Sequence, residues 1–198
     1  MAGHWSLAER VIRERGSLSS LIDMSKAEIR SIFAEEHDAA EAFLAVRETL
    51  RGALFESVAR ASLCPTDDKF LKYLLTLMAH RRSEVLLAFY ADRDGGFIAQ
   101  ETLVESDGHE VRVSPRAILA KAVRQEAEQV LLVHNHPSGD CRPSKTDIED
   151  TRRIEKQAGH LGIKLVDHLI VGGSSVFSIK QGRRFNPRPL DDGPDRQV

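Results

Sequence analysis

Long apolar runs are missing from this chain of 198 residues, and cysteine is scarce. No stretch provides the roughly 20 consecutive apolar residues of a membrane-spanning helix. The charges between Met1 and Arg15 leave no apolar core for a signal peptide. Two cysteines, Cys64 and Cys141, do not make the disulfide framework of a secreted scaffold. These absences predict a cytoplasmic protein with reduced cysteines and no membrane partner.

A surplus of positive charge is missing as well. The sequence carries 28 Lys and Arg against 30 Asp and Glu, a net charge of −2. Because nucleic-acid-binding proteins depend on basic surfaces, this balance argues against a nucleic-acid partner. The composition, with 41% hydrophobic and 29% charged residues, is that of an ordinary globular protein, and the length fits one or two domains.

Apolar residues recur at helical spacing through the first third of the chain and predict a small all-helical domain over residues 1–64. The sequence Cys64-Pro65-Thr66 interrupts this pattern and predicts the domain boundary. Strand and helix patterns then follow one another, which predicts a second domain over residues 65–185. Pro, Asp, Arg and Gly dominate the end of the chain, so a disordered tail is predicted over 186–198.

After a first helix, an antiparallel pair of strands is predicted to open the sheet of the second domain. Ser114 followed by Pro115 is an N-cap and first-turn pair, which predicts the start of a helix. The predicted elements are a helix over 67–80, strands over 84–90 and 97–105, a helix from 115, a strand over 130–134, a loop over 136–143, a helix over 148–161, a strand over 164–171 and an edge strand over 176–179.

Two histidines stand where the third of these strands ends. His134 and His136 occupy positions i and i+2, so both imidazoles can project to one side. Eleven positions after His136 comes Asp147, whose carboxylate returns at the start of the next helix. Two imidazoles and one carboxylate make a three-ligand set with the fourth position open, which is what a catalytic zinc ion needs.

Each of these residues also has a structural interpretation. One histidine can satisfy a core hydrogen bond while the other faces water. Ser144 and Asp147 follow Pro143 in a Ser-x-x-Asp pattern, which is typical of a capping box in which Asp147 bonds back to Ser144. The cap and the ligand interpretations compete for Asp147, and these residues by themselves leave the choice open.

The longer string around them resembles the signature of the JAMM (MPN, JAB-like) metallohydrolase superfamily and, within it, the bacterial RadC family. The resemblance covers residues 84–179 and is carried by His134-Asn135-His136-Pro137-Ser138-Gly139, by Pro143-Ser144 and Asp147, by Pro115-Arg116 and by Asp167-His168-Leu169-Ile170. It implies an α+β or α/β fold in which helices flank a mixed sheet in cytidine-deaminase-like layers, preceded by the small helical domain.

The resemblance also implies a site. It places one zinc ion per chain on His134, His136 and Asp147, and gives the Ser144 hydroxyl a part in holding a developing oxyanion. The implied activity is that of a metalloprotease or related amide hydrolase, which attacks a peptide, isopeptide or small-molecule amide directly with water.

Three carboxylates compete for the family's catalytic glutamate: Glu101, Glu105 and Glu110. Spacing cannot choose, because Glu101 and Glu105 point to the same face of a regular strand and both also fit solvated positions on a hairpin. Alignment with the family selects Glu101. The family's Gly-Thr pair shortly after its glutamate is replaced by Ser106 and Asp107, which indicates a different backbone shape there.

Asp167 and His168 could orient a ligand histidine, since zinc-binding imidazoles commonly donate their second nitrogen to another group. A structural pair at a strand end is the alternative. That alternative is preferred for His168, and the role of Asp167 stays open.

Two other functions compete with hydrolysis. RadC proteins carry a DNA-repair label, and the first helices resemble a helix-hairpin-helix segment, but Met24 to Ile29 contains no glycine to expose amides to phosphates. Residues 1–62 also contain eight Lys and Arg against ten Asp and Glu. These helices can instead serve packing, homodimer formation or substrate capture. A scaffold with structural zinc is the third alternative, although such a site needs four protein ligands and the sequence offers three.

Overall fold

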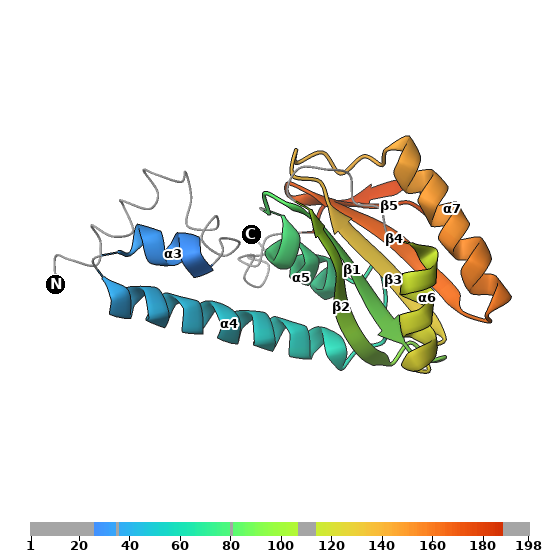
Figure 1. Cartoon of the computed structure of the whole chain (residues 1–198), viewed down its shortest axis with the longest axis horizontal. Helices are drawn as coiled ribbons and strands as arrows, with labels where there is room; N and C mark the ends of the chain where they lie inside the picture. Colours follow the sequence, from blue (N-terminus) through green and yellow to red (C-terminus); the bar gives the residue numbers. More distant parts are fainter. Residues whose placement is uncertain (1–25, 35, 80, 107–113, 188–198) are drawn as a thin grey trace, which may run out of the picture. The chain divides into compact units, whose positions relative to one another are not determined.

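The computed structural model describes residues 26–34, 36–79, 81–106 and 114–187 (Figure 1). The chain forms two compact units, one up to Leu54 and one from Phe55 onward. The division falls within α4 (His37–Ala59), ahead of the interruption at Cys64 and Pro65. Phe55 belongs to the second unit because its ring lies 5.1 Å from that of Phe97, measured between centroids.

The first unit contains α3 (Lys26–Ile32) and most of α4, up to Leu54. Its apolar core brings together Ile29, Phe33, Ala40 and Leu44. Two of the predicted segments can be compared with the structure only in part. Residues 1–25 of the predicted helical domain and residues 188–198 of the predicted disordered tail lie outside the described residues.

The second unit is built on a six-stranded mixed sheet with the strand order β2-β1-β3-β4-β5-β6 (Figure 1). β3 and β4 are parallel, and every other neighbouring pair is antiparallel. The strands are β1 (Glu84–Ala91), β2 (Phe97–Ser106), β3 (Gln129–Asn135), β4 (Lys164–Gly172), β5 (Ser175–Ser178) and β6 (Arg183–Phe185). The helices are α5 (Asp68–Met78), α6 (Pro115–Arg124) and α7 (Lys145–His160).

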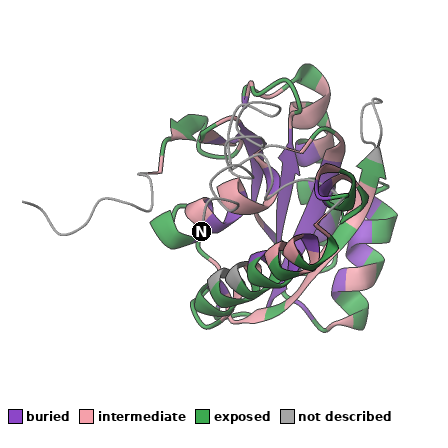
Figure 2. Ribbon diagram, turned by 90° about the vertical axis from the view of Figure 1, so that its left-hand side faces the viewer, coloured by how far each residue is buried: buried purple, intermediate pink, exposed green. Residues whose placement is uncertain are grey.

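Helices cover both faces of this sheet. On one face, Ile118 of α6 and Ile154 of α7 pack on a core that includes Leu132. On the other face, the Phe70 ring of α5 lies 5.3 Å from Phe89 of β1. The central strands are therefore buried while the outward faces of the helices are exposed (Figure 2). Strands that are covered on both faces have nearly continuous apolar sequences, and β1 and β3 show this pattern.

The structure confirms the predicted fold class, a mixed sheet flanked by helices. It corrects the edge of the sheet, because β6 pairs outside the strand predicted as the edge. β6 has only three residues, Arg183 to Phe185, too few for a strand pattern. Within the described ranges, no helix has both the length and the apolar character needed to cross a membrane.

Candidate metal centre

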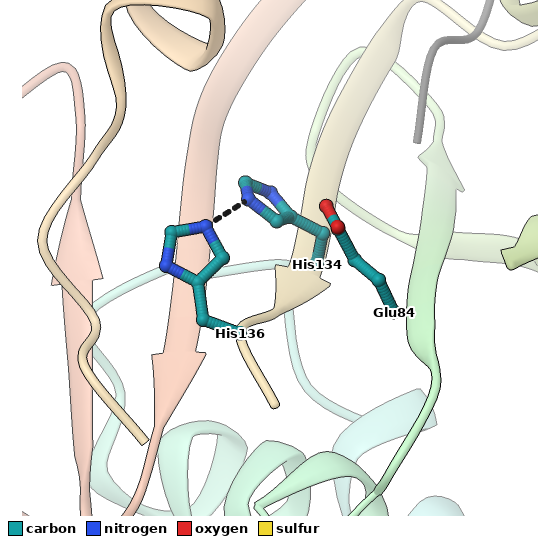
Figure 3. A group of neighbouring side chains, drawn as sticks. All are labelled: Glu84, His134 and His136. Carbon is teal, nitrogen blue, oxygen red and sulfur yellow. Dashed lines mark hydrogen bonds between the residues drawn. The ribbon is translucent and has the colours of Figure 1, made fainter. Parts of the chain in front are cut away.

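The end of β3 directs two imidazoles toward one face of the sheet. His134 is on the strand, with its side chain only 4% exposed. Asn135 points the other way, where its Oδ1 accepts a hydrogen bond from the Val85 amide at 2.9 Å. His136 extends the ladder by donating its backbone N–H to the Val171 carbonyl at 2.9 Å. The two Nε2 atoms consequently lie 3.0 Å apart (Figure 3).

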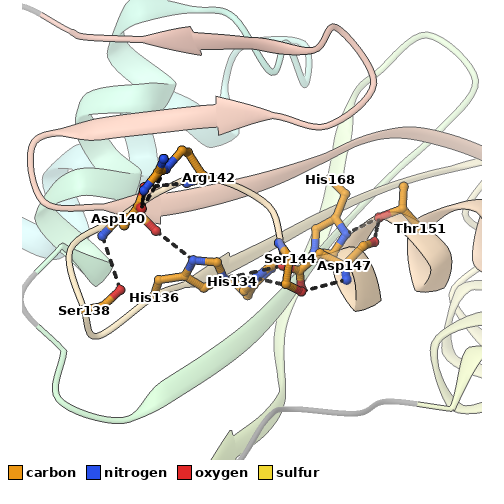
Figure 4. Close-up of polar contacts among 9 residues, drawn as sticks. All are labelled: His134, His136, Ser138, Asp140, Arg142, Ser144, Asp147, Thr151 and His168. Carbon is orange, nitrogen blue, oxygen red and sulfur yellow. Dashed lines mark hydrogen bonds and ion pairs between the residues drawn. The ribbon is translucent and has the colours of Figure 1, made fainter.

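Asp147 reaches the same point from the first turn of α7. Its Oδ1 lies 3.3 Å from Nε2 of His134, and its Oδ2 lies 3.5 Å from Nε2 of His136. The predicted capping box is also present: the Ser144 amide donates to Asp147 Oδ2 at 2.7 Å, and Ser144 Oγ accepts from the Asp147 amide at 3.1 Å (Figure 4). The two interpretations are compatible, because a carboxylate has about four lone-pair sites. The cap therefore fixes the carboxylate beside the histidines.

Asp147 brings a negative charge to the two histidines. Burial favours its protonated form, but hydrogen bonds from His134 and His136 outweigh burial and hold the pKa of Asp147 well below its usual value. The hydrogen bond to Asp147 in turn raises the pKa of His136. An ionised carboxylate and two imidazole nitrogens that converge on one point are the donor set that zinc prefers, so the residues present fit a zinc ion.

Glu101, assigned from the family alignment, is not brought to this cluster. It lies on β2 opposite Ala88 of β1, so β1 stands between it and β3. Its carboxylate makes an ion pair with Lys121 and accepts from Gln125 Nε2 at 3.0 Å, both on α6. The expectation that Glu101 faces the metal is corrected by these contacts, which occupy both of its oxygens.

The other two candidates do not replace it. Glu105 accepts hydrogen bonds from Arg81 at 3.2 Å and from Ser83 at 3.1 Å. Glu110 lies outside the described residues.

Glu84, which the sequence reasoning missed, stands beside the histidines. One carboxylate oxygen of Glu84 and one ring nitrogen of each histidine, His134 and His136, all lie within 4.8 Å of one another (Figure 3). The cause is register, since Leu86 pairs with His134 and Glu84 precedes Leu86 by two, on the same face of β1. The position of Glu84 at the start of an apolar strand is recognisable in the sequence. Assigning it to the metal centre, however, required knowing that β1 borders β3.

His168 of β4 stands behind His134. Its Nε2 lies 2.8 Å from His134 Nδ1, and its Nδ1 lies 2.6 Å from Oγ1 of Thr151 on α7 (Figure 4). Burial lowers the pKa of His168 well below its usual value, which keeps the ring neutral. His168, for which a structural pair at a strand end was the preferred interpretation, thus contacts a predicted ligand.

Asp167 has the structural role instead. Its Oδ2 accepts from Ser178 Oγ at 2.5 Å, and its Oδ1 accepts from the Lys180 amide at 3.1 Å. Its Oδ1 also accepts from the backbone N–H of His168 at 2.7 Å, so these bonds join β4 to β5 and to the residues that follow it.

The fold and the site together define a class of protein. A mixed sheet with helices on both faces carries two imidazoles at the end of a central strand and a capping carboxylate on the next helix. This is the arrangement expected of a JAB-type domain.

Comparison with known proteins gives the family. The model of the RadC-like JAB domain matches residues 64–184, more than half of the chain. The chain therefore belongs to the RadC-like JAB domain family.

The chain is also similar to several curated proteins. It is 32% identical over 180 residues to a UPF0758 protein of Carboxydothermus hydrogenoformans, covering 90% of this chain and 79% of that protein. It is 30% identical over 175 residues to a UPF0758 protein of Clostridium perfringens, covering 88% and 77%. A third, from Ruegeria pomeroyi, is 42% identical over 113 residues, covering 57% of this chain and 50% of the relative's length.

Proposed function

We propose that this protein is a zinc-dependent hydrolase that cleaves an amide bond in a peptide, an isopeptide or a small molecule. The observation that carries the proposal is the convergence of the His134 and His136 Nε2 atoms on the Asp147 carboxylate, with Glu84 beside them. Membership of the RadC-like JAB family supports it, because JAB-type domains include metallohydrolases.

In this proposal His134, His136 and Asp147 hold one zinc ion and leave one position open. A bound zinc ion supplies a water molecule whose pKa falls toward about 7. Glu84 accepts the proton that the attacking water gives up and returns it to the leaving amine, a role that typically contributes about 100- to 10,000-fold. A cavity of about 20 Å³, enough for one water molecule, is lined in part by Glu84, His134 and Asp147.

Ser144 has a second part in the proposal. Its Oγ accepts from the Asp147 amide, so that bond leaves the hydroxyl hydrogen available. A donor at this position can stabilise the negative charge that develops on the substrate's carbonyl oxygen.

One observation favours a second candidate. Because a Glu84 oxygen lies within 4.8 Å of both histidine ring nitrogens, Glu84 could instead serve as the fourth protein ligand. Four protein ligands close a zinc site, and a closed site is structural rather than catalytic. The two candidates therefore give Glu84 different roles.

Substitution of Glu84 separates them. The experiment measures zinc content, zinc affinity and turnover on a library of peptide and amide substrates for the wild type, Glu84→Gln and the control Glu105→Gln. We expect Glu84→Gln to keep its zinc while turnover falls at least about a hundredfold, and Glu105→Gln to remain active. Zinc lost from Glu84→Gln would support the structural candidate. Zinc retained with undiminished turnover would contradict the role proposed for Glu84.

A further inference from the structure

A buried chain of hydrogen bonds connects α7 to His134 through β4 (Figure 4). Thr151 Oγ1 lies 2.6 Å from the backbone oxygen of Asp147 and 2.6 Å from Nδ1 of His168. His168 Nε2 then lies 2.8 Å from Nδ1 of His134. Thr151 is 2% exposed and His168 is 5% exposed, so water does not compete for these contacts.

Only one placement of hydrogens satisfies all three contacts. The Asp147 carbonyl oxygen can only accept, so the single hydroxyl hydrogen of Thr151 must point toward it. Thr151 Oγ1 then accepts from Nδ1–H of His168, whose Nε2 is left as an acceptor. The reverse direction would leave two oxygens 2.6 Å apart with no hydrogen between them.

The accepting Nε2 of His168 requires a hydrogen on Nδ1 of His134. A neutral His134 is then without a hydrogen on Nε2, the atom that faces His136 and Asp147. His136 reaches the same state by another route, because its Nδ1 lies 2.7 Å from the Asp140 carbonyl oxygen and must donate to it. With both rings neutral, as binding of a cation requires, the two Nε2 atoms present lone pairs to one point.

We propose that Thr151 and His168 are positioning residues that set the tautomer of His134 and so prepare its Nε2 to bind a cation. The inference rests on the metal centre of the proposed function. It assigns the recognition of zinc partly to two residues that do not touch the ion. Groups of this kind commonly change metal affinity by about 10- to 100-fold.

Three variants test the proposal through zinc affinity, measured by competition with a chromophoric chelator. Thr151→Val removes the hydroxyl at nearly constant shape and should weaken zinc binding by about tenfold or more, whereas Thr151→Ser should bind as the wild type does. The matched control is Thr76→Val, because Thr76 makes the same kind of bond to a carbonyl four residues earlier, on α5, at 3.0 Å. Equal affinity of Thr151→Val and Thr76→Val would overturn the proposal.

A second measurement does not depend on turnover or on bound zinc. Two-dimensional ¹⁵N–¹H spectra of the metal-free wild type should show His168 with a hydrogen on Nδ1 and none on Nε2. The opposite tautomer would overturn the proposal. If the expected tautomer is found but the wild type binds no zinc, the proposed function fails while the hydrogen-bond chain stands, so the two failures can be told apart.

Discussion

At the scale of single residues, two glutamates on neighbouring strands show how surroundings determine the role of a carboxylate. Glu84 opens β1 beside the imidazoles, and Glu101 lies on β2 beside a lysine. In the sequence both are acidic residues on apolar strands. The two carboxylates have different partners because different helices and strands lie opposite them. Substitution of each glutamate is therefore predicted to have a different effect.

The first prediction concerns Glu101. Glu101→Gln should keep full zinc content and wild-type turnover, because its carboxylate contacts Lys121 and Gln125 rather than the metal centre. The cost should appear in stability instead. The side chains of Lys121 and Glu101 are 32% and 26% exposed, and a pair that is partly exposed to water contributes at most about 1 kcal/mol. Urea unfolding and a turnover assay on the same samples check both parts, and a folded but inactive variant would restore the assignment made from the sequence.

A second prediction concerns the ligands themselves. The wild type should bind about one zinc ion per chain, and either His134→Ala or His136→Ala should lose it, because two remaining donors cannot compete with water for zinc. Elemental analysis of the purified variants measures this directly. His160→Ala is the control, since His160 is exposed in the last turn of α7. A normal zinc content in both ligand variants would contradict the assignment of the metal centre to these histidines.

At the scale of elements, the loop between β3 and α7 is held against the end of β4. A Cβ atom on Gly172 would lie 2.5 Å from the Cys141 amide nitrogen and 2.7 Å from the Asp140 carbonyl carbon. No flexible side chain can move aside there, because both contacts are backbone. The Asp140 carbonyl is also the group that orients His136. The close approach of two backbones thus connects the packing of the loop to the geometry of a predicted ligand.

Gly172→Ala should therefore displace the loop. We expect zinc affinity to fall by about tenfold or more, and the free energy of unfolding to fall by about 1–3 kcal/mol because of overpacking. Gly159→Ala is the matched control within α7, where nothing lies within 4 Å of an added Cβ. That change should stabilise the protein by roughly 0.5–1 kcal/mol and leave zinc binding alone. Chelator competition and urea unfolding measure the two effects, and normal zinc affinity in Gly172→Ala would contradict the argument.

At the scale of the whole molecule, net charge distinguishes the proposed hydrolase from the alternative, a DNA-associated protein. A protein that neutralises several phosphates releases their counterions, so its affinity for DNA falls steeply with salt. The chain offers little for this mechanism, with a net charge of −2 and more acidic than basic residues in its first 62 positions.

The fourth prediction follows from this balance. The intact protein should show no specific binding to single-stranded, double-stranded or branched DNA at physiological salt. Fluorescence anisotropy at about 50 and about 200 mM salt tests it, since a protein with 6–10 phosphate contacts would lose roughly 10³- to 10⁵-fold in affinity over that range. Sub-micromolar, salt-sensitive binding to any of these forms would favour the DNA-associated function over hydrolysis.

Local pattern sufficed for most elements of the second domain. Apolar runs and turn residues predicted β1, β2, β3 and β4 within a few residues of their ends, because a buried strand must be apolar whatever its neighbours are. Ser144 and Asp147 likewise predicted a cap, which requires only four consecutive residues. β6 was missed because three residues carry too little pattern.

The chain by itself determined that His134 and His136 lie on one face, since alternation along a strand is a local property. It also determined that Asp147 stands in the first turn of the following helix. Only the tertiary structure decided which glutamate and which second histidine stand beside them. The choice of Glu84 depends on β1 bordering β3, and the contact of His168 depends on the register of β4. Strand order and register are set by packing between segments distant in sequence, which no local pattern records.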